Sequence, residues 1–278
     1  MQVKLTKSVI TVGSWTLLSR ILGMVREILL STFIGAGPLL DAFVAAFRLP
    51  NIFRRFFAEG AFNAAFVPLF AKRYESNMEP KEFANNVFAN LLTLLLILTS
   101  IAMVFMPVLV FLTAAGFASD ERFESTVDFG RIMFPYILFI SLAALFSGIL
   151  NTTGRFAMAA AAPVILNIII VVALLMAWAT QHNIMEWLVW SIPIAGIVQL
   201  SLLWLATYKT GIKITLSLPK WNKDIGNLIR LAIPAALAGG VLQINLLVGQ
   251  LVASQVTGAI SFLYLSLIHI SEPTRRST

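Results

Sequence analysis

The feature that most constrains this chain is a series of long apolar segments separated by short polar loops. We expect seven of them, at about residues 9–35, 41–70, 84–115, 130–152, 157–180, 185–208 and 226–253, and the start of an eighth near Ala259. Each is long enough to cross a bilayer as a helix, which takes about 20 apolar residues. The chain is 59% hydrophobic and only 12% charged, with a mean hydropathy of +0.88, whereas soluble domains average about 25% charged residues. We therefore expect an all-α fold, a polytopic bundle of membrane helices.

The loops between these segments alternate in charge. Basic residues gather at the N-terminus and in the loops after the second, fourth and sixth segments: Lys4, Lys7, Lys72, Arg73, Lys81, Arg155, Lys209, Lys213, Lys220 and Lys223. The intervening loops hold few or none, and residues 119–128 are acidic. Because cytoplasmic loops of membrane proteins collect Lys and Arg, the pattern predicts a cytoplasmic N-terminus. It also requires the second segment to cross the membrane despite its charges.

Several classes of function are excluded by composition. The net charge of +7 is explained by the basic loops, so we expect no nucleic acid as a partner. Cys is absent, which excludes disulfides and thiolate metal sites, and His182 and His269 lie in a loop and in the C-terminal tail, where they predict no metal site. The chain also lacks a GxSxG motif, a P-loop, an HExxH motif and an Asp-rich metal cluster. We expect neither an enzyme nor a cofactor.

The first two segments carry charges at membrane depth. These residues are Arg20, Arg26, Glu27, Asp41, Arg48, Arg54, Arg55 and Glu59, five positive and three negative, for a net charge of +2. A charge at the centre of a membrane helix costs about 2.5–3.5 kcal/mol, so these groups should face one another or a water-filled cavity. Guanidinium groups bind phosphate through two parallel hydrogen bonds. The pattern predicts a cationic cavity for an anionic, lipid-linked substrate.

Spacing within the two segments adds detail to this prediction. Arg55 and Glu59 are four residues apart and can pair on one helix face. Pro50 is expected to break the helix close to the arginines that follow it, as in the discontinuous helices of transporters. Gly23 shares a helix face with Arg20 and Glu27, where a small residue lets a neighbouring backbone or a ligand approach closely.

Structural explanations of the same residues remain open. Arg54 and Arg55 can extend toward water from a position near the membrane surface. Arg26 and Glu27 can form an ion pair between helices, and Asp41 can cap the start of the second segment. Amide side chains deeper in the bundle are expected to form hydrogen bonds between helices rather than to bind ligands: Asn151, Asn167, Gln199, Gln243 and Asn245.

Two motifs resemble the signature of the MurJ (MviN) lipid II flippases, a family of the multidrug/oligosaccharidyl-lipid/polysaccharide (MOP) exporter superfamily. They are SRILGMVRE at residues 19–27 and DAFVAAFRLPNIFRRFFAEGAF at residues 41–62. Two shorter stretches, FPY at residues 134–136 and GILN at residues 148–151, are also similar to family patterns. The resemblance covers about residues 5–264.

The resemblance implies a fold of two lobes around a central cationic cavity. It implies that lipid II, the undecaprenyl-pyrophosphate-linked precursor of peptidoglycan, is moved across the bacterial inner membrane by alternating access during cell-wall biogenesis. Lipid II and membrane lipids are then the expected partners. Carried over by position, the substrate-binding residues are Arg20, Arg26, Asp41, Arg54, Arg55 and Glu59.

The domain prediction follows from this resemblance. We expect residues 1–210 to form the N-terminal lobe, residues 211–265 to begin the second lobe, and residues 266–278 to be an aberrant tail. After Tyr264 the sequence departs from the family pattern, and we interpret the tail as a truncated or misassembled reading frame. Without both lobes the chain alone is not expected to transport. The alternatives are an exporter of another polyprenyl-linked saccharide, a membrane enzyme acting on polyprenyl phosphates, and a non-transporting fragment that binds wall-synthesis or division proteins.

Overall fold

The computed structural model describes residues 2–54 and 62–270, and in these two ranges it consists of helices and their connections, without strands. The predicted all-α fold is confirmed. The elements are α1 (Gln2–Phe33), α2 (Pro38–Arg54), α3 (Phe62–Glu75), α4 (Pro80–Val104), α5 (Met106–Thr113), the 3₁₀ turn η2 (Ala115–Phe117), α6 (Arg122–Met133), α7 (Tyr136–Thr152), α8 (Phe156–Ala179), α9 (Ile184–Tyr208), α10 (Lys223–Ala253) and α11 (Ala259–Ile270).

Prolines explain where two of the predicted segments are divided. Pro107 lies in the first turn of α5, directly after the break from α4, and Pro135 lies between α6 and α7. Proline has no N–H to donate to the preceding turn, so a helix tends to break or bend there. The expected break at Pro50 is wrong, because α2 continues through this residue to Arg54. Pro50 is buried, and packed neighbours allow a membrane helix to contain proline.

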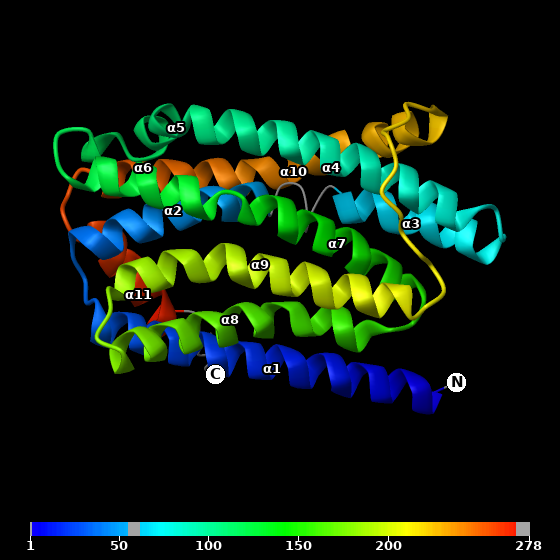
Figure 1. The fold of residues 1–278 in the computed structure, drawn as a ribbon, viewed down its shortest axis with the longest axis horizontal. Helices are drawn as coiled ribbons and strands as arrows, with labels where there is room; N and C mark the ends of the chain where they lie inside the picture. Colours follow the sequence, from blue (N-terminus) through cyan, green and yellow to red (C-terminus); the bar gives the residue numbers. More distant parts are fainter. Residues whose placement is uncertain (1, 55–61, 271–278) are drawn as a thin grey trace, which may run out of the picture.

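Successive helices run back and forth along the long axis of the molecule (Figure 1). The N-terminus and the α3–α4, α7–α8 and α9–α10 connections lie at one end, which we call the basic end because the predicted basic loops gather there. The α1–α2, α5–α6, α8–α9 and α10–α11 connections lie at the opposite end, which we call the acidic end after residues 119–128. The folded chain therefore separates the two kinds of loop that alternate in the sequence.

Four stretches of the described chain are long and apolar enough to cross a membrane by length and composition. They are α4, the combined α6–α7 stretch, α8 and α9. Membrane crossing by α1, by α2 with α3, and by α10 stays a prediction.

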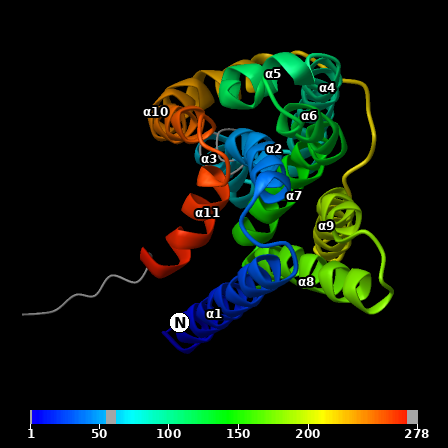
Figure 2. The same ribbon diagram turned by 90° about the vertical axis from the view of Figure 1, so that its left-hand side faces the viewer.

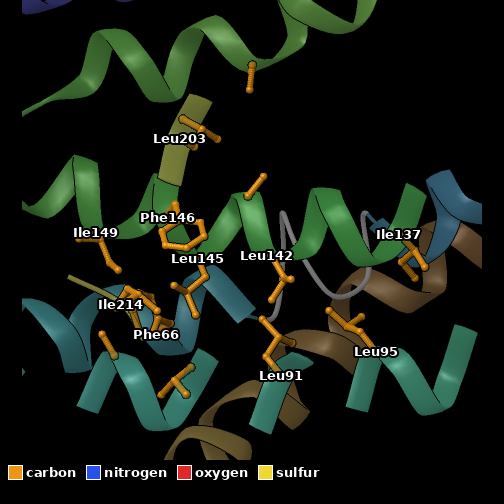
Figure 3. Close-up of a cluster of buried hydrophobic side chains, with 14 of the residues drawn as sticks. Phe66, Leu91, Leu95, Ile137, Leu142, Leu145, Phe146, Ile149, Leu203 and Ile214 are labelled. Carbon is orange, nitrogen blue, oxygen red and sulfur yellow. The ribbon is translucent and has the colours of Figure 1, made fainter. Parts of the chain in front are cut away.

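Seen along the helices, α2 and α7 lie in the middle, with α1 and α8 on one side and α4, α5 and α10 on the other (Figure 2). Apolar side chains between α3, α4 and α7 form one core cluster, which includes Phe66, Leu91 and Phe146 (Figure 3). A second cluster includes Phe43 of α2 and Leu188 of α9, and α2 packs mainly against α6. Helix α11 reaches from the side of α2 toward α1 (Figure 2). This course of α11 brings the candidate site together.

Candidate functional site

The first part of the site is a polar cluster around Arg26, where α1, α8 and α11 meet. The Arg26 guanidinium donates from Nε to Glu27 Oε1 at 3.1 Å and from Nη1 to Asn167 Oδ1 at 2.9 Å, and its Nη2 also contacts Glu27 Oε1. The Tyr264 hydroxyl donates to the same Glu27 oxygen at 2.8 Å. Asn167 Nδ2 donates to the carbonyl of Ser19 at 3.0 Å, which ties α8 to α1. One guanidinium and one carboxylate thus organise three helices.

The charged groups of this cluster are mostly buried, and Arg26 keeps the larger exposed area. The Arg26 side chain is 18% exposed and the Glu27 side chain 9% exposed. The second carboxylate oxygen, Glu27 Oε2, is buried, and none of the described groups donates to it. Arg48 on α2 also interacts electrostatically with Tyr264. The surroundings of Tyr264 are therefore cationic overall, and they retain a free acceptor on Glu27.

The other predicted site residues have different positions. Arg20 is exposed on α1, and Arg54, the last residue of α2, is partly exposed and donates from Nε to Asn51 Oδ1 at 3.2 Å. Arg55 and Glu59 lie outside the described residues, so their predicted pairing stays a prediction. Gly23 lies close to Asn167: a Cβ at this position would be 3.7 Å from Asn167 Nδ2, an ordinary contact.

The second part of the site is at the acidic end and is centred on Asp41. This side chain is fully buried. Its Oδ2 accepts from the N–H of Gly258 at 2.6 Å and from Arg122 Nη1 at 3.3 Å, and its Oδ1 accepts from the N–H of Ser261 at 2.7 Å. A carboxylate is stabilising at a helix N-terminus because unpaired N–H groups point toward it. The alternative that Asp41 caps its own helix is wrong: it caps α11, a helix more than 200 residues away in sequence.

Arg122 completes this buried ion pair and was missed by sequence reasoning, which described residues 119–128 only as acidic. Its side chain is 5% exposed, packs over the Phe117 ring at 4.3 Å, and donates to the Asp120 carboxylate from Nε at 3.0 and 2.9 Å and from Nη2 at 2.6 Å. Hydrogen bonding from Arg122 lowers the pKa of Asp120. A single arginine among acids was the available signal, but its second partner, Asp41, is too distant in sequence to be inferred.

Close backbone contacts complete the acidic end. The Gly116 N–H donates to Ser254 Oγ at 3.0 Å, and a Cβ on Gly116 would lie 2.4 Å from the Ser254 carbonyl carbon and oxygen. Gly258 has φ +83°, a conformation that side chains disfavour, and this turn directs its N–H at Asp41. We call this set of residues the acidic-end clasp: Asp41, Gly116, Arg122, Ser254, Gly258 and Ser261.

Residues 30–272 match the protein family described as "Lipid II flippase MurJ". The chain belongs to this family. A probable lipid II flippase MurJ from Rhizobium tropici is 47% identical over 266 residues, which are 93% of this chain and 50% of that relative. The solved structure titled "Lipid II flippase MurJ, inward closed conformation" has a TM-score of 0.78 at 29% identity, over 94% of this chain and 54% of that chain. An inward-facing MATE family transporter of the MOP superfamily, with a TM-score of 0.65 at 17% identity, shares the fold.

These comparisons establish this MurJ family member as a multi-pass membrane protein with a MOP-type helical fold. The chain spans about half the length of the curated relatives it matches. The prediction that amide side chains connect helices is confirmed for Asn167, and for Gln199, which donates to the Ala162 carbonyl at 2.6 Å. Within the described ranges, no three His, Asp or Glu residues are grouped to hold a metal ion.

The two parts of the site meet on α11. The N–H of Ser261, in the first turn of α11, donates to Asp41, and the hydroxyl of Tyr264, three residues later on the helix, donates to Glu27. Sequence reasoning did not identify Tyr264 as a site residue, because a tyrosine near the end of an apolar run is common. One short helix therefore connects the arginine cluster of α1 to the acidic-end clasp.

Proposed function

We propose that this chain is the amino-terminal half of a lipid II flippase, which moves undecaprenyl-pyrophosphate-linked peptidoglycan precursor across the bacterial inner membrane by alternating access. Membership of the MurJ family supports the substrate. The observation that carries the mechanism is the Arg26–Glu27–Tyr264 cluster, because it holds a guanidinium, the group best suited to bind a diphosphate, among three packed helices. On this proposal the protein is a transporter and not an enzyme.

The cluster supports a specific first step. In this structure Glu27 holds Arg26, so the pair is neutral, and a substrate diphosphate would compete with Glu27 for the guanidinium. Two phosphate groups carry more negative charge than one carboxylate, and bidentate contacts favour them further. Positive charge around the substrate headgroup would also come from Arg20 on α1 and from Arg48 and Arg54 on α2.

The contacts of α11 support a link between binding and opening. Once Arg26 binds the substrate, Glu27 loses its ion-pair partner and keeps only the hydrogen bond from the Tyr264 hydroxyl. On this proposal, that change shifts α11 relative to α1. The same helix is capped by Asp41, so its displacement would loosen the acidic-end clasp. On this proposal Asp41 acts on transport through α11, by closing one end of the path.

The distribution of loop charges supports an orientation. We place the basic end in the cytoplasm and the acidic end outside, because cytoplasmic loops are enriched in Lys and Arg. In this orientation the clasp closes the outer side, as expected of a state that receives substrate from within. We place the boundary between the first and second lobes at the α9–α10 connection, so that residues 1–210 form the first lobe.

The test uses a chimaera in which residues 1–264 replace the matching half of the Rhizobium tropici relative. Lipid II exposed on the outer face of cells is measured for the chimaera and for Arg20→Ala, Arg26→Ala and Arg54→Ala variants. We expect export by the chimaera and a loss of at least about tenfold for Arg26→Ala, the change in rate produced by about 1.4 kcal/mol. Arg131→Ala, an exposed arginine whose side chain is 46% exposed at the acidic end, is the matched control.

The result separates the alternatives. Normal lipid II export by all three variants would refute the role of the arginines. A chimaera that binds and exports a different polyprenyl-linked saccharide, but not lipid II, would favour a related MOP exporter. A chimaera that is folded and inserted but transports neither would favour a fragment that binds wall-synthesis or division proteins.

A further inference from the structure

The connection between α9 and α10 is an extended segment that crosses the basic end of the molecule (yellow in Figure 1). We call residues 209–222 the lysine strap. Its first half is fixed by two apolar side chains, Ile212 and Ile214, which are 7% and 6% exposed in the core cluster of α3, α4 and α7. The strap is thus part of the folded protein and not a loose linker.

Asparagines of α4 hold the strap on both sides of its centre. Asn85 accepts from the N–H of Thr215 at 3.0 Å, and Asn86 accepts from the N–H of Lys220 at 3.2 Å. Asn90 Nδ2 donates to the Lys220 carbonyl at 3.2 Å. The backbone between these two points is therefore held in place, and so are the directions of its side chains.

The side chains in this fixed stretch are unusual for their exposure. Leu216 is 80% exposed, Leu218 84% and Trp221 76%, more than any other large apolar side chain whose exposure the structure describes. Exposed apolar patches on an otherwise well-packed protein mark surfaces that bind a partner or a membrane. Because the strap is fixed to α4, these three side chains are not free to fold back into the core.

The position of the strap identifies the partner. The apolar part of α4 begins at Leu91, directly after the three asparagines that hold the strap, and α9 ends at Tyr208, where the strap begins. Both helices are long and apolar enough to cross a membrane. The strap therefore lies at the level where the hydrocarbon core gives way to lipid headgroups, the level at which Trp residues and amphipathic segments concentrate.

The charge of the segment favours an anionic lipid surface. Residues 209–223 contain four lysines and no acid, and all four lysine side chains are exposed. The nearby acids Glu79, Glu82 and Asp224 line a cavity of about 270 Å³ that Leu218 and Lys220 of the strap also line, and Asp224 pairs there with Arg73 at 2.5 Å. Exposed residues of this segment that do not line this cavity include both lysines and apolar groups: Lys209, Lys213, Lys223, Leu216 and Trp221.

We propose that the lysine strap is an interfacial anchor that binds the anionic surface of the bilayer. Leu216, Leu218 and Trp221 insert at the boundary between headgroups and acyl chains. Lys213, Lys220 and Lys223 contact lipid phosphates, each favouring the bound state by about fivefold, the equivalent of about 1 kcal/mol per lysine at such a surface. Because the strap joins α9 to α10, this anchor fixes the depth of that joint in the membrane. The anchor does not depend on which substrate is transported.

The absence of Cys from the chain allows a direct test of the anchor. Leu216→Cys and Trp221→Cys variants of the whole chain are labelled with a fluorophore and placed in lipid nanodiscs that contain a spin-labelled lipid quencher. We expect both labels to be quenched in phosphatidylglycerol discs and several-fold less in phosphatidylcholine discs. Lys213→Gln, Lys220→Gln and Lys223→Gln together should remove this dependence on the headgroup.

Two further labels calibrate the measurement. Leu96→Cys, at a half-exposed position in the apolar part of α4, gives the quenching of a membrane-embedded site, and Ser119→Cys, in the polar α5–α6 connection, gives that of a polar loop. Strap labels quenched no more than Ser119→Cys in anionic discs would overturn the proposal. Labels that sit in an apolar environment yet escape the lipid quencher, and respond to protein concentration, would also overturn it, by showing that a second copy covers the strap.

Discussion

The two ends of the molecule are closed by different physical means. The acidic-end clasp is built from a fully buried carboxylate, a buried guanidinium and a glycine in direct contact with a backbone carbonyl. The lysine strap is held by neutral hydrogen bonds of 3.0–3.3 Å from the partly exposed Asn85 and the buried Asn86, and Leu216, Leu218 and Trp221 remain exposed. Removing one partner of a buried ion pair strongly lowers stability, whereas water can replace a neutral hydrogen bond that becomes exposed. The clasp therefore suits a two-state closure, and the strap suits a contact that adjusts to the membrane.

Removing the central carboxylate tests this comparison most severely. We expect Asp41→Ala to lower the free energy of unfolding by about 3–5 kcal/mol, because it leaves a buried arginine with one fewer counter-charge and leaves the N–H groups of Gly258 and Ser261, at the start of α11, without their acceptor. Thermal unfolding of the chain in detergent measures the change. Asp128→Ala is the matched control, since Asp128 is 72% exposed and lies 3.8 Å from Arg131. Such surface pairs contribute about 0–1 kcal/mol.

Equal effects of the two aspartate substitutions would show that burial does not distinguish the clasp from the surface. The comparison with the strap would then lose its physical basis. A large effect confined to Asp41→Ala would support it.

A Gly→Ala substitution at each end of the molecule distinguishes a glycine in close backbone contact from one with open space around it. Gly116→Ala places a Cβ against the Ser254 carbonyl, where neither backbone can yield, and we expect a loss of about 1–3 kcal/mol. Gly226→Ala, in α10 near the strap, meets no atom within 4 Å and lies in a helix, so it should stabilise by up to about 1 kcal/mol. Opposite signs in thermal unfolding are the expected result. Destabilisation of similar size at both positions would contradict the assignment of Gly116 as a close contact.

The helices could be predicted from the sequence because each apolar segment has to be about as long as the bilayer is thick. The alternation of basic and non-basic loops then indicated which loops lie at the same end of the bundle. Sequence reasoning also selected Arg26 and Asp41 as candidate site residues, and the structure places each of them at the centre of a polar cluster. It could not identify Arg122 or Tyr264 as their partners, since hydrogen bonds between residues 81 and 238 positions apart leave no local pattern. The helix through Pro50 was missed for a related reason: whether proline breaks a helix depends on neighbours that pack around it.

A smaller effect is expected from loosening the strap. Asn86→Ala removes the acceptor of the Lys220 N–H, and the loss of one such hydrogen bond should cost about 1 kcal/mol locally, with little effect on global unfolding. Trypsin should then cleave the strap at Lys213 and Lys220 about fivefold faster, because cleavage follows the population of the open segment. Asn151→Ala, at an exposed position of α7, is the control. Unchanged cleavage would show that the asparagines of α4 do not hold the strap.

The smallest expected effect is a dependence of the clasp on pH through Asp120, the exposed carboxylate that pairs with Arg122. Arg122 lowers the pKa of Asp120 below its ordinary value by hydrogen bonding, so the folded state favours the carboxylate. The resulting stability is fully present above the ordinary Asp pKa of about 3.9 and is lost as the pH falls through the lower folded value. Comparing thermal unfolding of wild type and Asp120→Asn between pH 6 and pH 3 isolates this contribution from those of the other acids. The two curves should converge as the pH falls; a constant difference would mean that Asp120 acts without its charge. Asp120 is 37% exposed, and Arg122 still pairs with Asp41 when Asp120 is replaced. The loss of stability should therefore be much smaller than that of Asp41→Ala. Most of the stability of the clasp then comes from its buried carboxylate.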